Sequence, residues 1–348
     1  MHAAVLVVVV VAAASVRAGT PSAAAYPALD KVPPVNNQWS SAFIKNVPDL
    51  KVNSAQLPSP DWSADVTTCV GQKTWGLSYD DGPGPYTDDL LAQLKKRGVT
   101  ATFFVIGSRV LERPDVLQRV YAAGHQIGIH TWSHPALTTI SNDQVVAEIV
   151  YTARIIKETI GVTPKYMRPP YGDIDNRVRA ILKNMGLIVV DWNVDSGDAE
   201  GATNVASQFT SYAASNSGPV ISLEHDLFPK TEPQAAPALD GILAGGYKVV
   251  PVKDCVGTAP YNESFWKSLS ITFPTTTATQ ATTTSSSTTQ ASSSTTTTTS
   301  SSTTAASTSA ASTTSAAPLP RPSSNAAAAL SAVSVASLAS IFAIMFVL

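Results

Sequence analysis

The chain has 348 residues and a formal net charge of −2 at pH 7, with 44% hydrophobic and 14% charged residues. This length fits one large domain or two ordinary ones. A net charge so close to zero gives no reason to expect a nucleic acid or an anionic membrane surface as a partner. The composition is uneven, however, and both ends of the chain differ sharply from its middle.

The first 18 residues predict a secretory signal. Residues 3–14 form an apolar run that is too short to span a membrane comfortably. Ser15 and Ala18 put small residues where a signal peptidase needs them, so we expect cleavage near Ala18. Because only His2 gives the start any basic character, an uncleaved anchor is the alternative. Residues 19–68, rich in Pro and Asn, follow as an N-terminal extension that fits either a wrapping segment or a linker.

The chain has two cysteines, Cys69 and Cys255. In an oxidising compartment an even pair predicts a disulfide, and two buried free thiols are the alternative. The bond would close a long loop and stabilise the fold by up to about 5 kcal/mol in the chain-entropy model. We therefore expect a domain of residues 69–255. A C-terminal extension of residues 256–274 follows and carries an N-glycosylation sequon at Asn262.

Strand-like and helix-like segments alternate between the two cysteines. We expect strands at residues 74–79, 101–106, 126–129, 166–168, 187–190, 220–223 and 247–252, and helices at residues 87–97, 114–123, 142–161, 175–185 and 204–215. Repeated strand–helix units predict an α/β fold with a mostly parallel sheet, either open or closed into a barrel. In such folds the chemistry lies at the carboxyl ends of the strands. The polar clusters of this chain fall there: Asp80-Asp81, His130, Arg168, Asp195 and His225.

Two carboxylates, Asp80 and Asp81, lie side by side at the end of the first expected strand, and Gly-Pro-Gly-Pro follows them. Such residues are typical of a turn. The alternative is a reaction centre, in which two like charges at short range take different jobs.

The nearby histidines favour the reaction centre. His130 and His134 are spaced i, i+4 and can hold one cation between them. With Asp81 they make a two-histidine, one-carboxylate set, which suits Zn²⁺ or a similar divalent ion with open positions for water. We expect His125 to be structural.

Residues 275–325 predict an extracellular stalk. From Thr275 to about Ala317 the chain is almost only Ser, Thr and Ala, which bury too little apolar surface to fold and are typical of a disordered, O-glycosylated segment. Residues 326–348 are apolar and uncharged. The small residues before them predict a glycosylphosphatidylinositol anchor at Asn325, or at Ser324, with removal of the tail. A C-terminal transmembrane anchor is the alternative.

Five short motifs occur in order at the expected strand ends, and together they resemble the five motifs of the polysaccharide deacetylase family, carbohydrate esterase family 4. The resemblance covers about residues 75–252. The secreted, stalked and lipid-anchored setting is similar to that of fungal chitin deacetylases in particular. The motifs are Ser78-Tyr-Asp-Asp-Gly-Pro83, His130-Thr-Trp-Ser-His134, Arg168-Pro-Pro-Tyr171, Asp195-Ser-Gly-Asp198 and Leu223-Glu-His225.

The resemblance implies a distorted (β/α) barrel and one divalent metal ion, Zn²⁺ or Co²⁺. Asp81, His130 and His134 would hold the ion. Asp80, free of the metal, would bind the attacking water and take its proton as the general base. Arg168 would keep Asp80 ionised and oriented.

The same resemblance assigns the later steps of the reaction. The backbone N–H of Tyr171 would stabilise the oxyanion, and Leu223 would line the slot for the acetyl methyl group. His225 would protonate the departing sugar amine. A neighbouring carboxylate would raise the pKa of His225 so that it carries this proton. The sequence favours Asp195 as that carboxylate and leaves Asp198 as the alternative.

The expected protein is therefore a metal-dependent hydrolase that removes N-acetyl groups from chitin or chito-oligosaccharides and gives chitosan and acetate. We expect a monomer, tethered by its anchor to the outer face of the plasma membrane and acting on cell-wall glycan, without a nucleic-acid partner. A deacetylase of another acetylated glycan is one alternative. A catalytically silent, wall-anchored glycan-binding glycoprotein is another, favoured by Ala199, where the family usually has an aromatic residue that walls the acetate pocket. Trp192 lies a few residues earlier.

Overall fold

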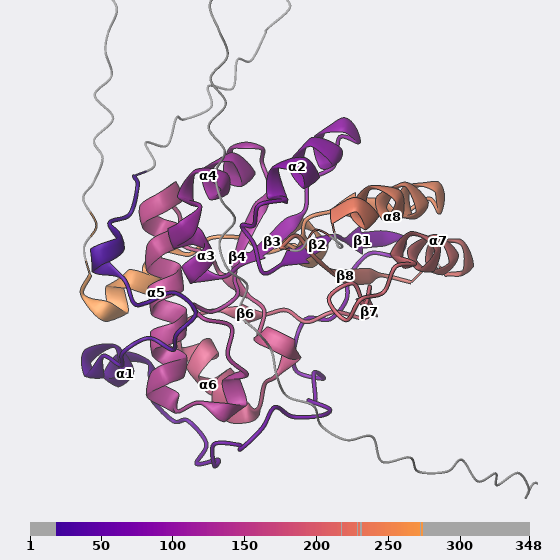
Figure 1. The fold of residues 1–348 in the computed structure, drawn as a ribbon. Helices are drawn as coiled ribbons and strands as arrows, with labels where there is room; N and C mark the ends of the chain where they lie inside the picture. The colour runs from indigo at the N-terminus through magenta and orange to yellow at the C-terminus, as the bar shows by residue number, and fades with distance from the viewer. Residues whose placement is uncertain (1–18, 217, 228, 230–231, 272, 274–348) are drawn as a thin grey trace, which may run out of the picture. The chain divides into compact units, whose positions relative to one another are not determined.

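A computed structural model describes residues 19–273 except residues 217, 228, 230–231 and 272 (Figure 1). The expected signal, the stalk, the attachment residue Asn325 and the apolar tail lie outside the described residues. Within the described part of the chain, no helix is both long enough and apolar enough to cross a membrane.

A parallel sheet forms the centre of the fold. In the described residues it has nine strands in the order β6-β5-β4-β3-β2-β8-β1-β9, and β7 pairs with β8 beside this path. Every strand pair is parallel. The strands are β1 (Thr74–Gly76), β2 (Ser78–Asp80), β3 (Thr102–Val105), β4 (Gln126–Ile129), β5 (Tyr166–Met167), β6 (Ile188–Val189), β7 (Val194–Asp195), β8 (Val220–His225) and β9 (Lys248–Val250).

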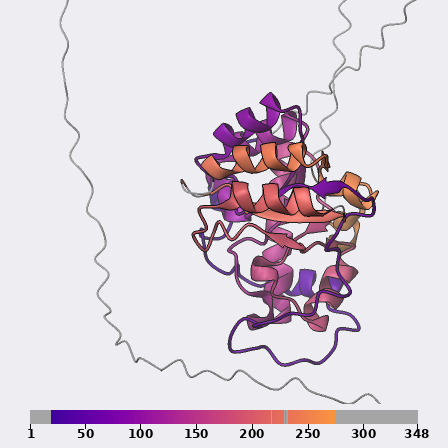
Figure 2. The same cartoon turned by 90° about the vertical axis from the view of Figure 1, so that its right-hand side faces the viewer.

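Helices follow the strands and cover the sheet, which confirms the expected distorted (β/α) barrel (Figure 1). Helices α7 and α8 pack side by side along one flank (Figure 2). The helices are α1 (Asn37–Phe43), α2 (Thr87–Lys96), α3 (Gly107–Glu112), α4 (Pro114–Ala122), α5 (Asn142–Ile160), α6 (Asn176–Asn184), α7 (Val205–Ser215), α8 (Glu232–Ala244) and α9 (Val252–Val256). Short 3₁₀ turns lie at Ala23–Ala25, Leu137–Thr139, Pro170–Gly172 and Glu263–Leu269.

Both faces of the sheet are packed. On β3, Phe103 belongs to the larger core cluster and its neighbour Phe104 to the smaller one, because successive side chains of a strand point to opposite faces. All four residues of β3 are buried. Such uninterrupted apolar strands are typical of parallel sheets covered on both sides, which explains why the sequence shows a continuous run here.

Helix boundaries follow local signals where such signals exist. Ser141 and Gln144 form a capping box at the start of α5, and Gly161 ends that helix in the left-handed conformation with φ of 80°. In contrast, α8 contains Pro237, a residue that normally interrupts a helix, and the sequence does not predict it. The short helix α3 is also missed.

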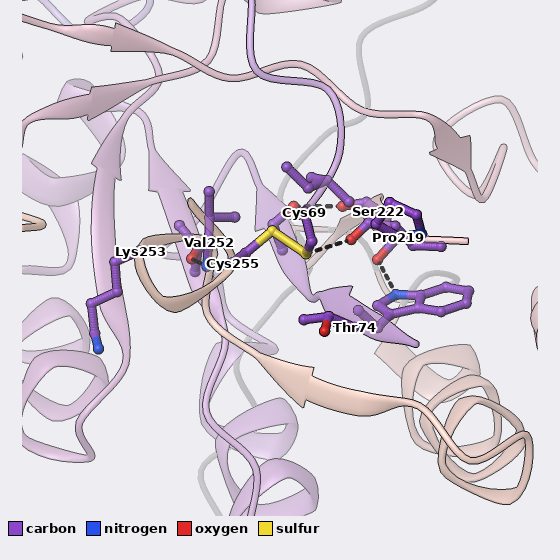
Figure 3. Close-up of a disulfide and its surroundings, with 12 residues drawn as sticks. Cys69, Thr74, Pro219, Ser222, Val252, Lys253 and Cys255 are labelled. Carbon is purple, nitrogen blue, oxygen red and sulfur yellow. Dashed lines mark hydrogen bonds between the residues drawn. A yellow bond between two sulfur atoms is a disulfide. The ribbon is translucent and has the colours of Figure 1, made fainter. Parts of the chain in front are cut away.

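The predicted disulfide is present: Cys69 and Cys255 are bonded, with Cα atoms 4.6 Å apart (Figure 3). Both cysteines are buried. A Cβ atom on Gly76 of β1 would lie 3.0 Å from the Cys255 sulfur and 3.3 Å from the Cys69 sulfur. The missing side chain at Gly76 therefore lets the disulfide pack directly on β1.

The N-terminal extension wraps the barrel and is more than a linker. Helix α1 packs against α5. At the C-terminal end of α1, the Asn184 side chain donates 2.8 Å hydrogen bonds to the carbonyl oxygens of Phe43 and Lys45. Val66 forms a parallel bridge with Val190. These contacts hold the middle and the C-terminal end of the extension on the barrel.

We predict that replacing both cysteines by Ala lowers the free energy of unfolding by about 4–5 kcal/mol, because the bond closes a loop of 186 residues. Guanidinium denaturation followed by tryptophan fluorescence measures this change. Reducing the disulfide of the unmodified chain is the control and should have a similar effect. A loss below about 1 kcal/mol would show that the cross-link does not reduce the entropy of the unfolded chain as the chain-entropy model assumes.

Candidate active site

The sequence-predicted site residues gather at the carboxyl edge of the sheet. Asp80, Asp195 and His225 are the last residues of β2, β7 and β8. His130 and Arg168 directly follow β4 and β5. Since the carboxyl ends of parallel strands meet at one edge, these side chains come together. Arg168 is fully buried beside Asp80, and the others line one pocket of about 630 Å³: Asp80, Asp81, His130, His134, Tyr171, Asp195, Leu223 and His225.

Three ligand atoms converge in this pocket. The Oδ1 atom of Asp81 lies 3.4 Å from Nε2 of His130 and 3.3 Å from Nε2 of His134, and the two Nε2 atoms are 3.1 Å apart. Ligands of a tetrahedral zinc ion, each about 2.0–2.1 Å from the metal, are spaced by about this amount. Within the described residues, these three form the one group whose ligand atoms could hold a metal ion.

The hydrogen bonds around His130 and Asp81 are compatible with a bound cation. Nδ1 of His130 lies 2.8 Å from the carbonyl oxygen of Arg168, which can only accept, so Nδ1 carries the proton and Nε2 has an open lone pair. Oδ1 of Asp81 is buried without a hydrogen-bond donor among the described residues. A buried carboxylate oxygen without a donor, beside the Nε2 atoms of two histidines, fits a divalent ion.

The charges of the same residues also fit a cation. Burial, and then the neighbouring His130, lower the pKa of His134 to about 4, so the ring is neutral near pH 7. Burial alone would raise the pKa of Asp81, but the neighbouring imidazoles of His130 and His134 outweigh burial and hold this pKa well below its usual range. At physiological pH the set therefore includes the anionic Asp81 and the neutral imidazole of His134.

Asp80 and Asp81 face different partners. Oδ1 of Asp80 accepts a 2.9 Å hydrogen bond from Nη1 of Arg168, and both side chains are buried. Arg168 is held in turn by the carbonyl oxygens of Val190 and Asp191. Oδ2 of Asp80 lies 3.8 Å from Nε2 of His130. Because both side chains are buried, Arg168 and Asp80 do not form an ordinary surface ion pair. One oxygen of Asp80 is fixed by arginine and the other faces the ligand atoms.

The carboxylate partner of His225 is Asp198, so the preference for Asp195 is wrong. Oδ1 of Asp198 lies 2.6 Å from Nδ1 of His225, and Oδ2 accepts the backbone N–H of His225 at 2.9 Å. Asp195 is exposed and accepts hydrogen bonds from Nε1 of Trp192 and the backbone N–H of Gly197. The cause is a turn after β7, where Gly197 has φ of 64° and the chain brings Asp198 back to β8.

The Asp198 contact determines the protonation of His225. Burial would lower the pKa of this imidazole, but the hydrogen bond with Asp198 and the charge of Asp81 outweigh it and raise the pKa to about 9. Since Nδ1 donates to Asp198, the proton on Nε2 is the one that can be given to a ligand. His225 is thus a cationic acid near pH 7.

Left-handed backbone marks the loops of the site. Asp81, Thr131, His134 and Tyr171 all have φ between 60° and 76°, in a region that residues other than glycine rarely adopt. Such strain is tolerated where surrounding contacts fix the backbone, and it is common at functional sites. The Tyr171 ring lies 4.6 Å from the His134 ring, centroid to centroid, and is 52% exposed to solvent.

Two buried carboxylates that the sequence does not single out support these loops. Glu148 of α5 accepts the backbone N–H groups of Trp132 and Ser133 at 2.6 and 2.9 Å and the Ser133 hydroxyl at 2.6 Å, so it fixes the turn between His130 and His134. Asp226 accepts the Thr87 hydroxyl at 2.5 Å, and this hydroxyl accepts the backbone N–H of Gly84. A carboxylate in the apolar stripe of a helix is the signal that points to Glu148.

The remaining predicted residues lie away from the pocket or along its wall. Ala199, Trp192 and Leu223 all line the pocket, so its wall contains an indole as well as the small side chain of Ala199. Asn262 precedes the turn at residues 263–269 and accepts hydrogen bonds from the backbone and hydroxyl of Ser264. Its glycosylation stays a prediction. His125 accepts the backbone N–H of Ala101 in the core, as expected for a structural histidine.

We predict that Asp198→Asn lowers the pKa of His225 from about 9 toward or below the ordinary value of about 6.5, because the stabilising carboxylate is lost. An NMR titration of the imidazole signals in the metal-free protein measures this. Asp195→Asn is the matched control and should leave the pKa of His225 nearly unchanged. The opposite pattern would restore Asp195 as the partner.

The chain is similar in sequence to a known protein family and to several of its members. Residues 67–190 match the family described as polysaccharide deacetylase. The chain is 39% identical over 275 residues to chitin deacetylase 1 of Cryptococcus neoformans var. grubii, covering 67% of this chain and 58% of that protein. It is 37% identical over 234 residues to the chitin deacetylase of Amylomyces rouxii, covering 63% and 55%. The chain thus spans a little over half the length of these relatives.

Two solved structures are similar in fold. The chitin deacetylase from Colletotrichum lindemuthianum superposes with a TM-score of 0.54 at 30% identity, covering 57% of this chain and 95% of that one. A peptidoglycan N-acetylglucosamine deacetylase gives a TM-score of 0.54 at 26% identity, covering 59% and 100%. Almost the whole of each solved chain therefore has a counterpart here.

Proposed function

The chain belongs to the polysaccharide deacetylase family, and on that basis we propose that it hydrolyses the N-acetyl groups of N-acetylglucosamine units in chitin, giving chitosan and acetate. The observation that carries this proposal is that a base, an acid and a set of metal-binding atoms lie in one pocket. A base held by arginine, Asp80, and an acid held by a carboxylate, His225, flank the donor set of Asp81, His130 and His134. Amide hydrolysis needs a base for the water and an acid for the amine.

The donor set would hold one divalent ion, Zn²⁺ or Co²⁺. Such an ion supplies Lewis acidity, which polarises a carbonyl oxygen and lowers the pKa of a water molecule. Hydrogen bonds behind the donor atoms support this role. The carbonyl oxygen of Arg168 orients the His130 ring, and Glu148 fixes the turn between His130 and His134.

Asp80 would accept a proton from the attacking water through Oδ2. Its other oxygen is occupied by Arg168, which keeps the side chain in one orientation. Oδ2 faces the ligand atoms, where the water and the acetamide carbonyl would meet. The two adjacent carboxylates therefore take different roles: Asp80 moves a proton and Asp81 is a ligand.

The bond to be broken lies between the acetyl carbon and the sugar nitrogen. As the water oxygen adds to the carbonyl carbon, the backbone N–H of Tyr171 would donate to the oxyanion. His225 would then give its Nε2 proton to the nitrogen, because an amine leaves poorly without one. The C–N bond breaks, and acetate and a free amine are released. Leu223 would contact the acetyl methyl group.

We infer the setting of this reaction from the chain ends and from the named relatives. Residues 1–18 would direct secretion, and residues 275–325 would form a stalk anchored at Asn325 after removal of residues 326–348. A monomer would then act on chitin at the cell wall, outside the plasma membrane. The catalytic domain would comprise residues 69–255, with flanking extensions at residues 19–68 and 256–274.

A second substrate class is favoured by one observation, the fold similarity to a peptidoglycan N-acetylglucosamine deacetylase. Both substrates present the same acetamide, so the same groups would act. Acetate release from N-acetylglucosamine oligomers, acetylated xylan and peptidoglycan, measured in parallel, decides between them. We expect the N-acetylglucosamine oligomers to be the best substrate, and a clear preference for either of the others would overturn the chitin assignment.

We predict that Asp80→Asn keeps the metal but lowers acetate release by about 10²–10⁴-fold, the usual contribution of a general base. Asn retains an oxygen that can accept from Arg168, so the fold should be intact. In contrast, His130→Ala should lose both metal and activity, because it removes a ligand. Acetate release and metal content of the two variants, measured together, check this. Full activity of Asp80→Asn would rule out Asp80 as the base.

A further inference from the structure

The N-terminal extension reaches the active-site pocket although most of it lies outside the matched family region, which begins at residue 67. Asp30 and Gln56, both from the extension, line the same pocket as Asp80 and His134. The pocket volume of about 630 Å³ is in the range that holds a drug-sized ligand. The pocket thus holds more than an acetamide group, and part of its wall is not formed by the barrel.

The first part of the extension is held on the loop that carries the histidine ligands. The Tyr26 ring is stacked on Trp132, with centroids 5.5 Å apart and planes within 5°. Nε1 of Trp132 donates a 3.2 Å hydrogen bond to the carbonyl oxygen of Ala28. Trp132 lies between His130 and His134 in the sequence, so the extension is tied to the site itself.

Asp30 follows this contact and is fixed with one oxygen still available. Its Oδ1 accepts from the Ser108 hydroxyl at 3.1 Å and from Nη2 of Arg109 at 3.0 Å. Its side chain is 54% exposed, and Oδ2 accepts no hydrogen bond from the described residues. Arg109 also forms an ion pair with Glu112, so its positive charge is shared between Asp30 and Glu112. Asp30 therefore offers the pocket a hydrogen-bond acceptor in a fixed position.

Gln56 lies on a second stretch that is fixed to the turn carrying Tyr171. Next to it, the backbone N–H of Leu57 donates to Asp173 at 2.8 Å. Nε1 of Trp62 donates to the carbonyl oxygen of Gly172 at 2.9 Å, and the Trp62 ring packs 4.8 Å from that of Trp192, which lines the pocket. The Gln56 side chain is exposed and makes no hydrogen bond with the described residues.

We propose that the N-terminal extension forms a wall of the glycan-binding cleft, with Asp30 and Gln56 as specificity-determining residues. They would hydrogen-bond hydroxyl or acetamide groups of the sugar units next to the one that reacts. A carboxylate that accepts and an amide that both donates and accepts match such groups. The exposed ring of Tyr171 and the indole of Trp192 add aromatic surface for sugar rings. This inference rests on the proposed function, since it names the substrate of that site.

The test compares long and short substrates in the full-length protein. Gln56→Ala should raise KM for the N-acetylglucosamine pentamer about fivefold, the typical effect of losing one hydrogen bond. Adding Asp30→Ala should raise it further, to about 20-fold. For the dimer the change in KM should be smaller, while kcat and metal content should stay unchanged. Unchanged KM for the pentamer in both variants would overturn the proposal.

Two controls keep this test separate from folding and from the proposed reaction. Gln38→Ala and Asp49→Ala change the same residue types in the same extension, but neither residue lines the pocket, so KM should stay at the wild-type value. Gln56 is exposed and unbonded to the described residues, so its replacement leaves the fold intact. Pentamer binding by isothermal titration calorimetry needs no turnover. If the wild-type protein releases no acetate but binds the pentamer more tightly than the variants do, the cleft wall is supported and the deacetylase function is refuted. If the wild-type protein does not bind the pentamer, both proposals are overturned.

Discussion

The site depends on how buried carboxylates are neutralised at one edge of a parallel sheet. Removing a carboxylate from water is costly unless a cation or several donors compensate for it. Asp80 is compensated by Arg168, and Asp198 by the cationic His225. Asp81 is different: its pKa is held well below the usual range, yet its Oδ1 is buried without a donor among the described residues. A divalent ion between Asp81 and two imidazole nitrogens would supply the missing charge.

Other buried carboxyl groups with unpaired oxygens nearby behave in the opposite way. Burial raises the pKa of Asp191 to about 8 and that of Asp226 to about 7, and it also raises the pKa of Glu224 well above its usual value. These groups can lose their charge by taking up a proton and need no cation. The contrast distinguishes Asp81 from the neighbouring acidic residues, and it explains how several of them can share a small volume.

The sequence predicts the sheet and most of the site because both depend on local signals. Alternating strand and helix patterns indicate the parallel fold, and the strand ends indicate where Asp80, His130 and Arg168 meet. The partner of His225 cannot be chosen in the same way, because Asp195 and Asp198 are both near in sequence and the turn at Gly197 decides which one returns to β8. The role of residues 19–68 depends on contacts with distant residues such as Trp132 and Gly172, which no local pattern reveals.

The most direct test of this account is the dependence of acetate release on a bound metal. The full-length protein would be assayed with N-acetylglucosamine oligomers as purified, after dialysis against a chelator, and after addition of Zn²⁺ or Co²⁺, with metal content measured at each stage. We predict one ion per chain, loss of activity when the ion is removed, and recovery when Zn²⁺ or Co²⁺ is returned. Full activity in protein shown to be free of metal would contradict it.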